Sequence, residues 1–176
     1  MPQPEIAKNL KTHRTNSSWS LTKAAAETGV SKAMLGQIER GESSPTIATL
    51  WKIATGFHLP LTAFIEAPSS DEFMQFKNGI RFKTLFAFDP ILKTEMFAHC
   101  LEPHQSQLSA AHDNGVVEDI VVLTGEVEIL AEEKWVYLQT GDTLRFAADQ
   151  PHGYRNPTSQ PATFHNIMHY PRLKTP

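Results

Sequence analysis

Cysteine is nearly absent from this chain, which holds only Cys100 among its 176 residues. One cysteine cannot form an internal disulfide, and this is typical of proteins kept in a reducing compartment. The chain has no run of about 20 apolar residues that could cross a bilayer, and its start, MPQPEIAKNLK, lacks the apolar core of a signal peptide. We therefore expect a cytoplasmic protein with no membrane partner, in which Cys100 is a small buried residue rather than a redox-sensing thiol.

Strong positive charge is also lacking. The formal net charge is −3, of which residues 1–66 contribute +2 and the remainder contributes −5. Nucleic-acid-binding domains are usually far more basic, so a nucleic-acid partner would belong to the first part of the chain. Its phosphate contacts would need helix N-termini and backbone amides in addition to Lys23, Lys32, Arg40 and Lys52. Tight binding by a monomer is therefore not expected.

The chain does contain, over residues 20–56, the pattern of two short helices that meet at Gly29. Ser20 and Ser31 are good N-cap residues, and glycine suits a left-handed helix end. Apolar or small residues recur three and four positions apart in both segments, which is the spacing of a buried helical face. The second helix is predicted to run from Ser31 to Arg40.

The outward face of this second helix is short, polar and nearly free of bulky side chains. It holds Lys32, Ala33, Gly36, Gln37 and Arg40. Small side chains allow a helix to approach the floor of the major groove, and glutamine offers both a donor and an acceptor to adenine. The stretch therefore predicts double-stranded DNA as a partner.

The residues SL, A, GVS, QIERG, P, TL and IA, spread over about residues 5–66, resemble the helix-turn-helix of the XRE family of lambda-repressor-like domains. The resemblance implies a five-helix DNA-binding domain over residues 1–66, in which the DNA contacts come from Lys23, Ser31, Lys32, Ala33, Gln37 and Arg40. It also implies that Arg14 and Glu39 form a buried structural pair. Gly36 departs from the pattern, which would have a helix former at this position, and glycine in a helix costs about 1 kcal/mol relative to alanine. We interpret it as a close-packing position; the alternative is that the cost is simply tolerated.

Further helices are expected around this pair. The first covers about residues 5–14, and a fifth begins at Pro60. In the loop GESSP, Ser44 is expected to cap the fourth helix, with Pro45 as its first residue. The polar run 67–71 has no apolar period and predicts a short linker.

Beyond the linker the pattern changes from helical to alternating. Short segments rich in β-branched and aromatic residues, separated by turn residues, predict strands. They are residues 80–82, 94–101, 118–123, 125–131, 135–138, 143–146 and 163–170. Many short strands without helices favour a sandwich or a barrel.

The spacing of this second part resembles the cupin fold, a double-stranded β-helix barrel. The matching residues are Ala110, His112, Glu118 and Gly125 in the first cupin motif, and Gly141, Asp142, Pro151, His152 and Asn156 in the second. Together the two resemblances identify an XRE–cupin transcriptional regulator of the α + β class. They imply a helix-turn-helix domain (1–66), a linker (67–71) and a cupin-like effector-binding domain (72–176).

The resemblance also points to a candidate metal site. Metal-binding cupins carry three histidines and one glutamate, and this chain matches only His112, Glu118 and His152, because Ala110 has no donor atom. Two histidines and a carboxylate still make the facial triad of a non-haem Fe(II) site. Alternatively, these groups line a metal-free pocket and bind an organic effector, or only one another.

Four more polar residues are candidates for the same pocket. Gln107 and Tyr154 are assigned as effector-binding residues. His165 and His169 are four apart on a predicted strand and share one face. If that face is inward, they could supply the donor that is missing at Ala110; the sequence does not decide which face is inward.

The leading hypothesis is a sequence-specific DNA-binding regulator, not an enzyme, that pairs as a homodimer and senses a small-molecule effector through its cupin domain. A divalent metal is its candidate cofactor. Two alternatives remain open. One is a mononuclear non-haem Fe(II) cupin enzyme that uses His112, Glu118 and His152 and carries an appended helix-turn-helix domain. The other is a protein-interaction module whose helix-turn-helix no longer reads DNA.

Overall fold

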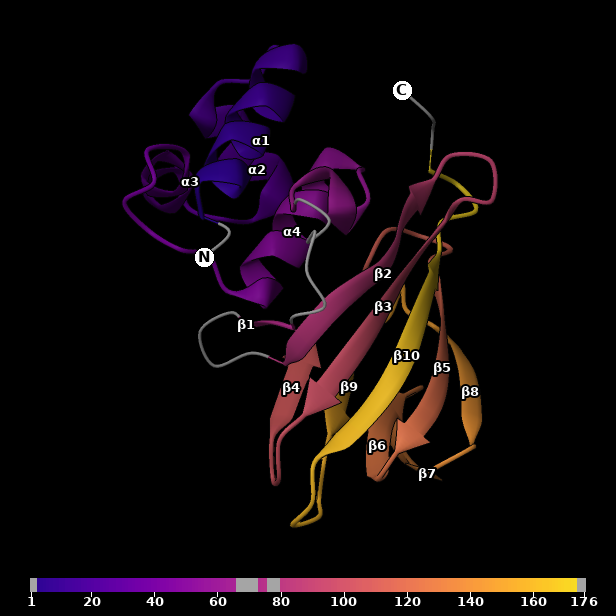
Figure 1. Ribbon diagram of the computed structural model, residues 1–176. Coiled ribbons are helices and arrows are strands. Elements are labelled where there is room, and N and C mark those ends of the chain that lie inside the picture. Colours follow the sequence, from indigo (N-terminus) through magenta and orange to yellow (C-terminus); the bar gives the residue numbers. More distant parts are fainter. Residues whose placement is uncertain (1–2, 66–72, 76–79, 174–176) are drawn as a thin grey trace. The chain divides into compact units, whose positions relative to one another are not determined.

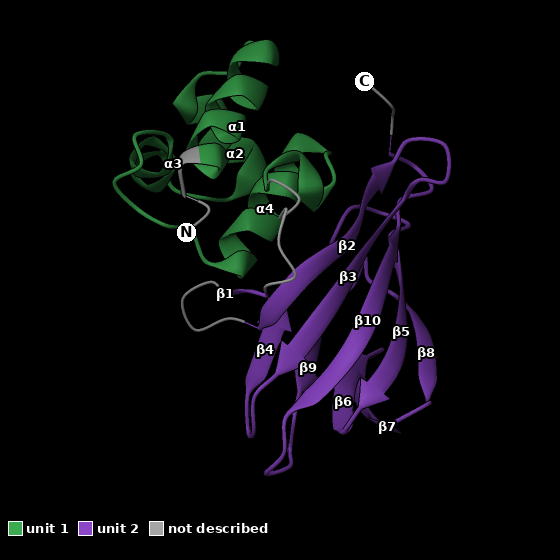
Figure 2. Cartoon of the chain, viewed as in Figure 1, with its two compact units in different colours: residues 1–67 green, residues 68–176 purple. Residues whose placement is uncertain are grey.

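Helices occupy the first part of the chain and strands the second (Figure 1). The computed structural model describes residues 3–65, 73–75 and 80–173. The chain divides into unit 1, residues 1–67, and unit 2, residues 68–176 (Figure 2). The predicted linker 67–71 lies outside the described residues. No helix in the described part of the chain is both long and apolar enough to cross a membrane.

Unit 1 contains four α-helices and one short 3-10 turn among its described residues. They are α1 (Gln3–Asn16), α2 (Leu21–Thr28), α3 (Lys32–Glu39), α4 (Ile47–Phe57) and the turn η1 (Leu61–Ala63) (Figure 1). The predicted pair of short helices at residues 20–56 is thus confirmed as α2 and α3.

Two predictions about the end of unit 1 are wrong. The expected fifth helix is only η1, because Pro60 is extended (φ −65°, ψ 155°) and the turn after it is three residues long. The cap of α4 is Thr46 rather than Ser44, since the Thr46 hydroxyl accepts the bond from the backbone N–H of Thr49 at 3.1 Å. The helix therefore begins at Ile47 and not at Pro45.

The core of unit 1 is formed by one face of each helix. Its most deeply buried side chains are Ile6, Leu10, Leu35, Ile38, Leu50, Ile53, Leu61 and Phe64. Gly56 brings α4 close to α2: a Cβ on it would lie 2.6 Å from the Cα of Thr28. At the edge of this core Trp19 stacks on Phe57, with ring centroids 4.6 Å apart. The helices are therefore held by close backbone packing as well as by apolar burial.

Unit 2 consists of two antiparallel sheets (Figure 1). In sheet order, the larger is built from β1 (Met74–Gln75), β2 (Arg81–Asp89), β3 (Thr94–Leu101), β10 (Ala162–His169), β5 (Val117–Thr124) and β8 (Thr143–Ala147). The smaller is built from β4 (Ser106–Ser109), β9 (His152–Arg155), β6 (Glu126–Ala131) and β7 (Lys134–Gln139). No strand pairing joins the two sheets within the described residues, so the expected barrel is not closed.

The two sheets bury alternate side chains between them. On β10 the burial alternates strictly from Ala162 to His169, and the buried residues are Ala162, Phe164, Asn166 and Met168. Three strands, β1, β4 and β9, are absent from the sequence prediction. Because β9 starts at His152, this omission concerns the site directly.

Candidate DNA-reading helix and cupin site

The position of α3 is fixed at its start by side-chain caps. The Ser31 hydroxyl accepts a hydrogen bond from the backbone N–H of Met34 at 3.2 Å, and Ser20 caps α2 in the same way through Lys23 at 3.1 Å. Gly29 ends α2 with φ 65°, in the left-handed region. These three features confirm the predicted caps, and they leave the first turn of α3 with amide donors at its end.

An ion pair fixes the other end of α3. The Arg14 guanidinium of α1 donates two hydrogen bonds to the Glu39 carboxylate, from Nε at 2.6 Å and from Nη2 at 2.8 Å. Its Nη1 donates a third, to the backbone carbonyl of Trp19 at 2.8 Å. The two side chains are 15% and 8% exposed, so the predicted buried pair between α1 and α3 is confirmed.

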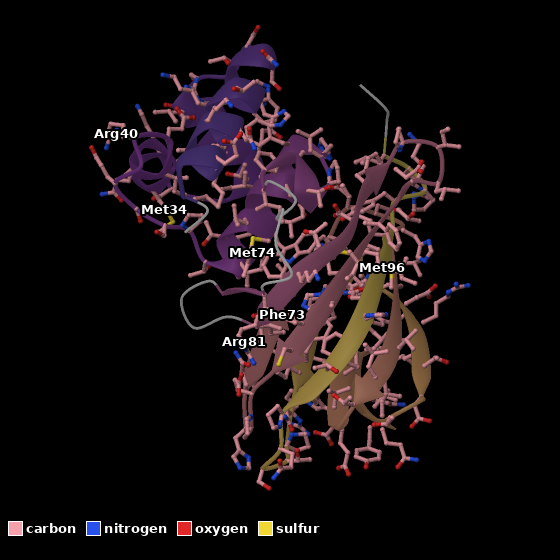
Figure 3. All side chains as sticks on the ribbon, viewed as in Figure 1. Met34, Arg40, Phe73, Met74, Arg81 and Met96 are labelled. Atoms are coloured by element: carbon pink, nitrogen blue, oxygen red, sulfur yellow. The ribbon has the colours of Figure 1, made fainter. Side chains whose placement is uncertain are left out.

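The outward face of α3 is open to solvent. Lys32, Ala33, Gln37 and Arg40 are exposed, as are Lys23 and Ser31. A surface hollow of about 500 Å³ runs over this face and is lined by Leu21, Lys32, Ala33, Gly36, Gln37 and Arg40. Met34 is also 40% exposed, and Met34 and Arg40 extend from α3 at the periphery of the helical unit (Figure 3). The structure thus brings the predicted face together, with Met34 as an apolar residue beside it.

Gly36 is the floor of this hollow. It is buried, and a Cβ on it would lie 3.1 Å from Nη1 of Arg40 and 3.7 Å from Cδ1 of Leu21. The nearer contact is with the far end of a flexible side chain rather than with backbone. Gly36 is therefore a close-packing position, although only a side chain would have to shift if it carried a Cβ: its lack of a side chain leaves room for the Arg40 guanidinium.

In unit 2 three ligand-type side chains converge between the sheets. His112 lies in the loop before β5, Glu118 lies on β5, and His152 begins β9. Nε2 of His112 lies 3.3 Å from Oε1 of Glu118, and Nε2 of His152 lies 3.5 Å from the same oxygen. All three residues are buried, and their ligand atoms lie within 4.8 Å of one another.

Hydrogen bonds from neighbouring residues orient this triad. The Tyr154 hydroxyl donates to Oε2 of Glu118 at 2.5 Å, and Nδ2 of Asn166 donates to the same oxygen at 2.8 Å. Nδ1 of His152 lies 2.9 Å from the carbonyl of Gln150, which makes Nδ1 the protonated nitrogen. Nε2 of His152 and Oε1 of Glu118 are left buried and without a hydrogen-bond partner. Both atoms therefore direct lone pairs toward the centre of the triad.

The charge of the triad follows from these contacts. Burial alone would raise the pKa of Glu118, but the adjacent His112, His152 and Tyr154 outweigh it and lower that pKa to about 2. Burial lowers the pKa of His152. A carboxylate anion beside a neutral imidazole is the form that binds a cation. The donor set and its unpartnered atoms thus fit a divalent metal held by two histidines and one carboxylate.

The remaining candidate residues differ in whether they contact the triad. Tyr154 contacts it through the hydrogen bond to Glu118. Gln107 is engaged elsewhere, since its Oε1 accepts a hydrogen bond from the backbone N–H of Ile80 at 3.1 Å. His165 and His169 alternate with the buried Asn166 and so lie on the opposite side of β10. His169 instead lies 3.0 Å from Oδ2 of Asp119. Neither histidine supplies the donor missing at Ala110.

Two interior residues were missed by sequence reasoning. Asn166 is a polar residue among alternating apolar ones on β10, and that interruption was the available signal. His99 on β3 is likewise a polar residue among apolar ones, but because its neighbours are apolar on both faces the pattern does not indicate that it lies inside. Its ring stacks on Phe164 and Tyr154 with centroids 5.1 and 6.3 Å away, and both ring nitrogens are buried without partners. Burial lowers the pKa of His99 to about 4, so the ring is neutral at pH 7.

Comparison with known proteins agrees with both units. Residues 10–64 match the helix-turn-helix family HTH_3, and residues 97–168 match the cupin family Cupin_2. The chain is 43% identical over 170 residues to the HTH-type transcriptional regulator SutR of Escherichia coli K12, which covers 95% of this chain and 96% of that protein. Two solved structures are also similar.

The first is an HTH_3 family transcriptional regulator from Vibrio cholerae, with 45% identity, a TM-score of 0.89 and 98% of both chains covered. The second is the cupin domain of an XRE family transcriptional regulator from Enterobacter cloacae, with 41% identity, a TM-score of 0.52, and coverage of 53% of this chain and 98% of that one. The chain therefore combines a helix-turn-helix unit with a cupin unit, and it belongs to the XRE-type helix-turn-helix transcriptional regulators that carry a cupin domain.

Proposed function

We propose that this regulator binds a specific DNA sequence through α3 and senses a small-molecule effector through its cupin unit. The observation that carries the DNA proposal is the exposed outward face of α3, capped at one end by Ser31 and held at the other by the Arg14–Glu39 pair. Relatives of 43% and 45% identity over nearly the whole chain are transcriptional regulators. The chain is accordingly a regulator and not an enzyme.

The exposed residues of α3 have distinct roles in this proposal. Gln37 and Lys32 reach base edges, and Ala33 allows the helix to sit deeply in the major groove. Ser31 and the backbone amides beside it face a phosphate at the helix start. Lys23 and Arg40 contact the phosphate backbone on either side.

We further infer that two copies act together. The net charge of residues 1–66 is only +2, and one short helix offers few contacts, so a two-fold pair is needed to reach useful specificity. Ile91, Leu92 and Phe86, the most exposed large apolar residues of the described chain, support a contact through unit 2, at 88%, 70% and 68% exposure. Sedimentation equilibrium of Ile91→Asp tests this: dissociation to monomers is expected, and an unchanged dimer, or a monomeric parent chain, contradicts it.

In the cupin unit, His112, Glu118 and His152 would hold a divalent metal. Such an ion would supply a Lewis-acidic position at which an oxygen of the effector coordinates. Tyr154 and Asn166 hold the Glu118 carboxylate in place for this role, and Gln150 fixes the tautomer of His152. Nε2 of His152 and Oε1 of Glu118 have no hydrogen-bond partner, and this supports a metal site rather than a group of three residues that only contact one another.

The DNA proposal is tested by selecting duplexes from a random pool with the full chain. Enrichment of one palindromic sequence is expected, with half-sites about one helical turn apart. No enrichment after repeated rounds would contradict the reading role of α3 and favour a helix-turn-helix that contacts protein only.

The metal proposal is tested by elemental analysis and by titration with Mn²⁺, Fe²⁺ and Zn²⁺ under anaerobic conditions. About one ion per chain is expected, with binding lost in His152→Ala. The matched control is His165→Ala, because His165 lies on the opposite side of β10 and should leave the stoichiometry unchanged. Equal binding by the two variants would show that the triad is not the site.

A further inference from the structure

The interior of unit 2 holds unpartnered polar atoms beyond the triad. They are Oγ1 of Thr84, Oδ1 of Asn166, and both Nδ1 and Nε2 of His99. Nearly all buried polar groups in folded proteins have a hydrogen-bond partner, so a group of orphaned atoms needs an explanation. The three residues come from different strands, β2, β10 and β3, and of their side chains only that of Asn166 has a role described above, through the bond from its Nδ2 to Glu118.

The strand register places these residues on the same face of the larger sheet, with Phe97 between Thr84 and Asn166. Thr84 and Asn166 are both paired with Phe97 on β3, one from each side. His99 lies two residues further along β3, where its neighbours are Phe82 and Phe164. Side chains in adjacent rows on the same face of a sheet lie within reach of one small molecule.

Aromatic rings form the wall beside these atoms. The rings of His99, Tyr154 and Phe164 are nearly parallel, with interplanar angles of 14°, 21° and 19° and centroids 5.1 to 6.3 Å apart. Tyr154 comes from β9 of the opposite sheet and reaches Glu118 through its hydroxyl. The orphaned atoms and the triad therefore share Tyr154 and Asn166 as common neighbours.

The chemistry of the orphaned atoms selects the ligand. Oδ1 of Asn166 is an amide oxygen and can only accept, and the bond from Nδ2 to Glu118 fixes the orientation of the amide. A neutral His99 has one donor and one acceptor nitrogen, and Thr84 offers a hydroxyl. A ligand that satisfies this set must bring hydroxyl or amine hydrogens as well as an acceptor.

We propose that Thr84, His99 and Asn166 form the effector-recognition wall of unit 2, and that the effector is a small organic molecule bearing at least one hydroxyl or amine donor. The inference rests on the proposed sensing function and names the ligand class for that site. His99 makes the direct contact, with its ring beside those of Phe164 and Tyr154.

The first test needs no ligand and uses the full chain. If His99 is kept for binding, then the folded state tolerates an unpaired buried imidazole, and replacing it by an apolar residue should stabilise unit 2. We expect His99→Phe or His99→Leu to raise the Tm of unit 2 by about 2–5 °C. His165→Phe, on the opposite face of β10, is the control and should show no gain. A lower Tm in both His99 variants would show a structural histidine and overturn the proposal.

The second test uses matched probes that differ by one donor: glycolate against acetate, and L-lactate against propionate. Thermal shift of the parent chain should favour the donor-bearing member of at least one pair by about tenfold in apparent affinity, and His99→Phe should remove the difference. An equal response to both members of each pair, or no response, contradicts the ligand class. DNA binding by the same variants separates the two ideas: if no chain binds any duplex while the probe results hold, the regulator proposal fails and the recognition wall stands.

Discussion

The Arg14–Glu39 pair gives the sharpest prediction about unit 1. Replacing Arg14 by Met removes both bonds to the Glu39 carboxylate and the bond to the Trp19 carbonyl, and it leaves a side chain that is only 8% exposed as an unpaired anion. Breaking a buried pair on one side costs about 3–5 kcal/mol. Because Arg14 is itself 15% exposed, we expect the lower end, about 3 kcal/mol.

That loss is large for a unit of this size. For a domain of about 60–100 residues, 1 kcal/mol corresponds to about 4–8 °C in Tm, so the Arg14→Met variant should lose at least about 12 °C. Circular dichroism at 222 nm follows this unit selectively, since every α-helix of the described chain lies in unit 1. The control is Lys8→Met, which removes an exposed ion pair with Glu5 and should cost less than about 1 kcal/mol.

A double variant decides the cause. When Glu39 is also replaced, by Leu, no unpaired buried charge remains, so Arg14→Met/Glu39→Leu should be more stable than Arg14→Met alone. Two results would refute the reasoning: Arg14→Met no more destabilising than the Lys8→Met control, or a double variant whose cost equals the sum of the two single costs.

Three further predictions concern charge, pH and packing. In the parent chain the Glu42 carboxylate accepts bonds of 2.7 Å from Nε and Nη2 of Arg40, and Glu42→Gln removes this negative charge beside the guanidinium. The sequence-independent affinity for duplex DNA at low salt should therefore rise severalfold, and an equal rise in Glu5→Gln would contradict this. The pKa of His99 is about 4 in the folded state and about 6.5 when unfolded. Between these values the unfolded state binds the extra proton, so the stability of unit 2 falls as the pH falls from about 6.5 toward 4. Urea titrations should show a loss of up to about 2 kcal/mol between pH 8 and pH 5, and a smaller loss in His99→Gln. Gly56→Ala places a Cβ against the α2 backbone and should cost unit 1 about 1–3 kcal/mol; an unchanged urea midpoint by circular dichroism would show that the helices separate easily.

The helix-turn-helix was predictable because its signals are local. Ser31 and Gly29 act within one turn of their own positions, so caps and helix ends could be placed from the sequence and are found there. The end of unit 1 was less predictable, because Pro60 permits a helix start but does not require one. Phe64 and Ile65 after η1 are buried, and burial is a tertiary property that the local sequence does not define.

The three residues of the cupin triad were predictable, but only some of the residues around them were. His112, Glu118 and His152 follow from the resemblance to the cupin motifs, and the structure brings them together. The orientation of β10 was not decidable, because alternation defines two faces without saying which is inside. That choice places Asn166 beside Glu118 and turns His165 away, and it depends on pairing with strands distant in sequence.

The central claim is that α3 reads base edges, and the affinity of Gln37→Ala for a selected duplex tests it most directly. Gln37 is exposed on α3, so we expect its replacement by alanine to leave the fold intact. A good base contact contributes about 1–3 kcal/mol, so the variant should bind the selected sequence about tenfold or more weakly, with random-sequence affinity nearly unchanged. Thr12→Ala, a small polar change on the exposed side of α1, should bind both like the parent chain. If Gln37→Ala and Thr12→Ala keep the same ratio of selected to random affinity, α3 does not read the sequence.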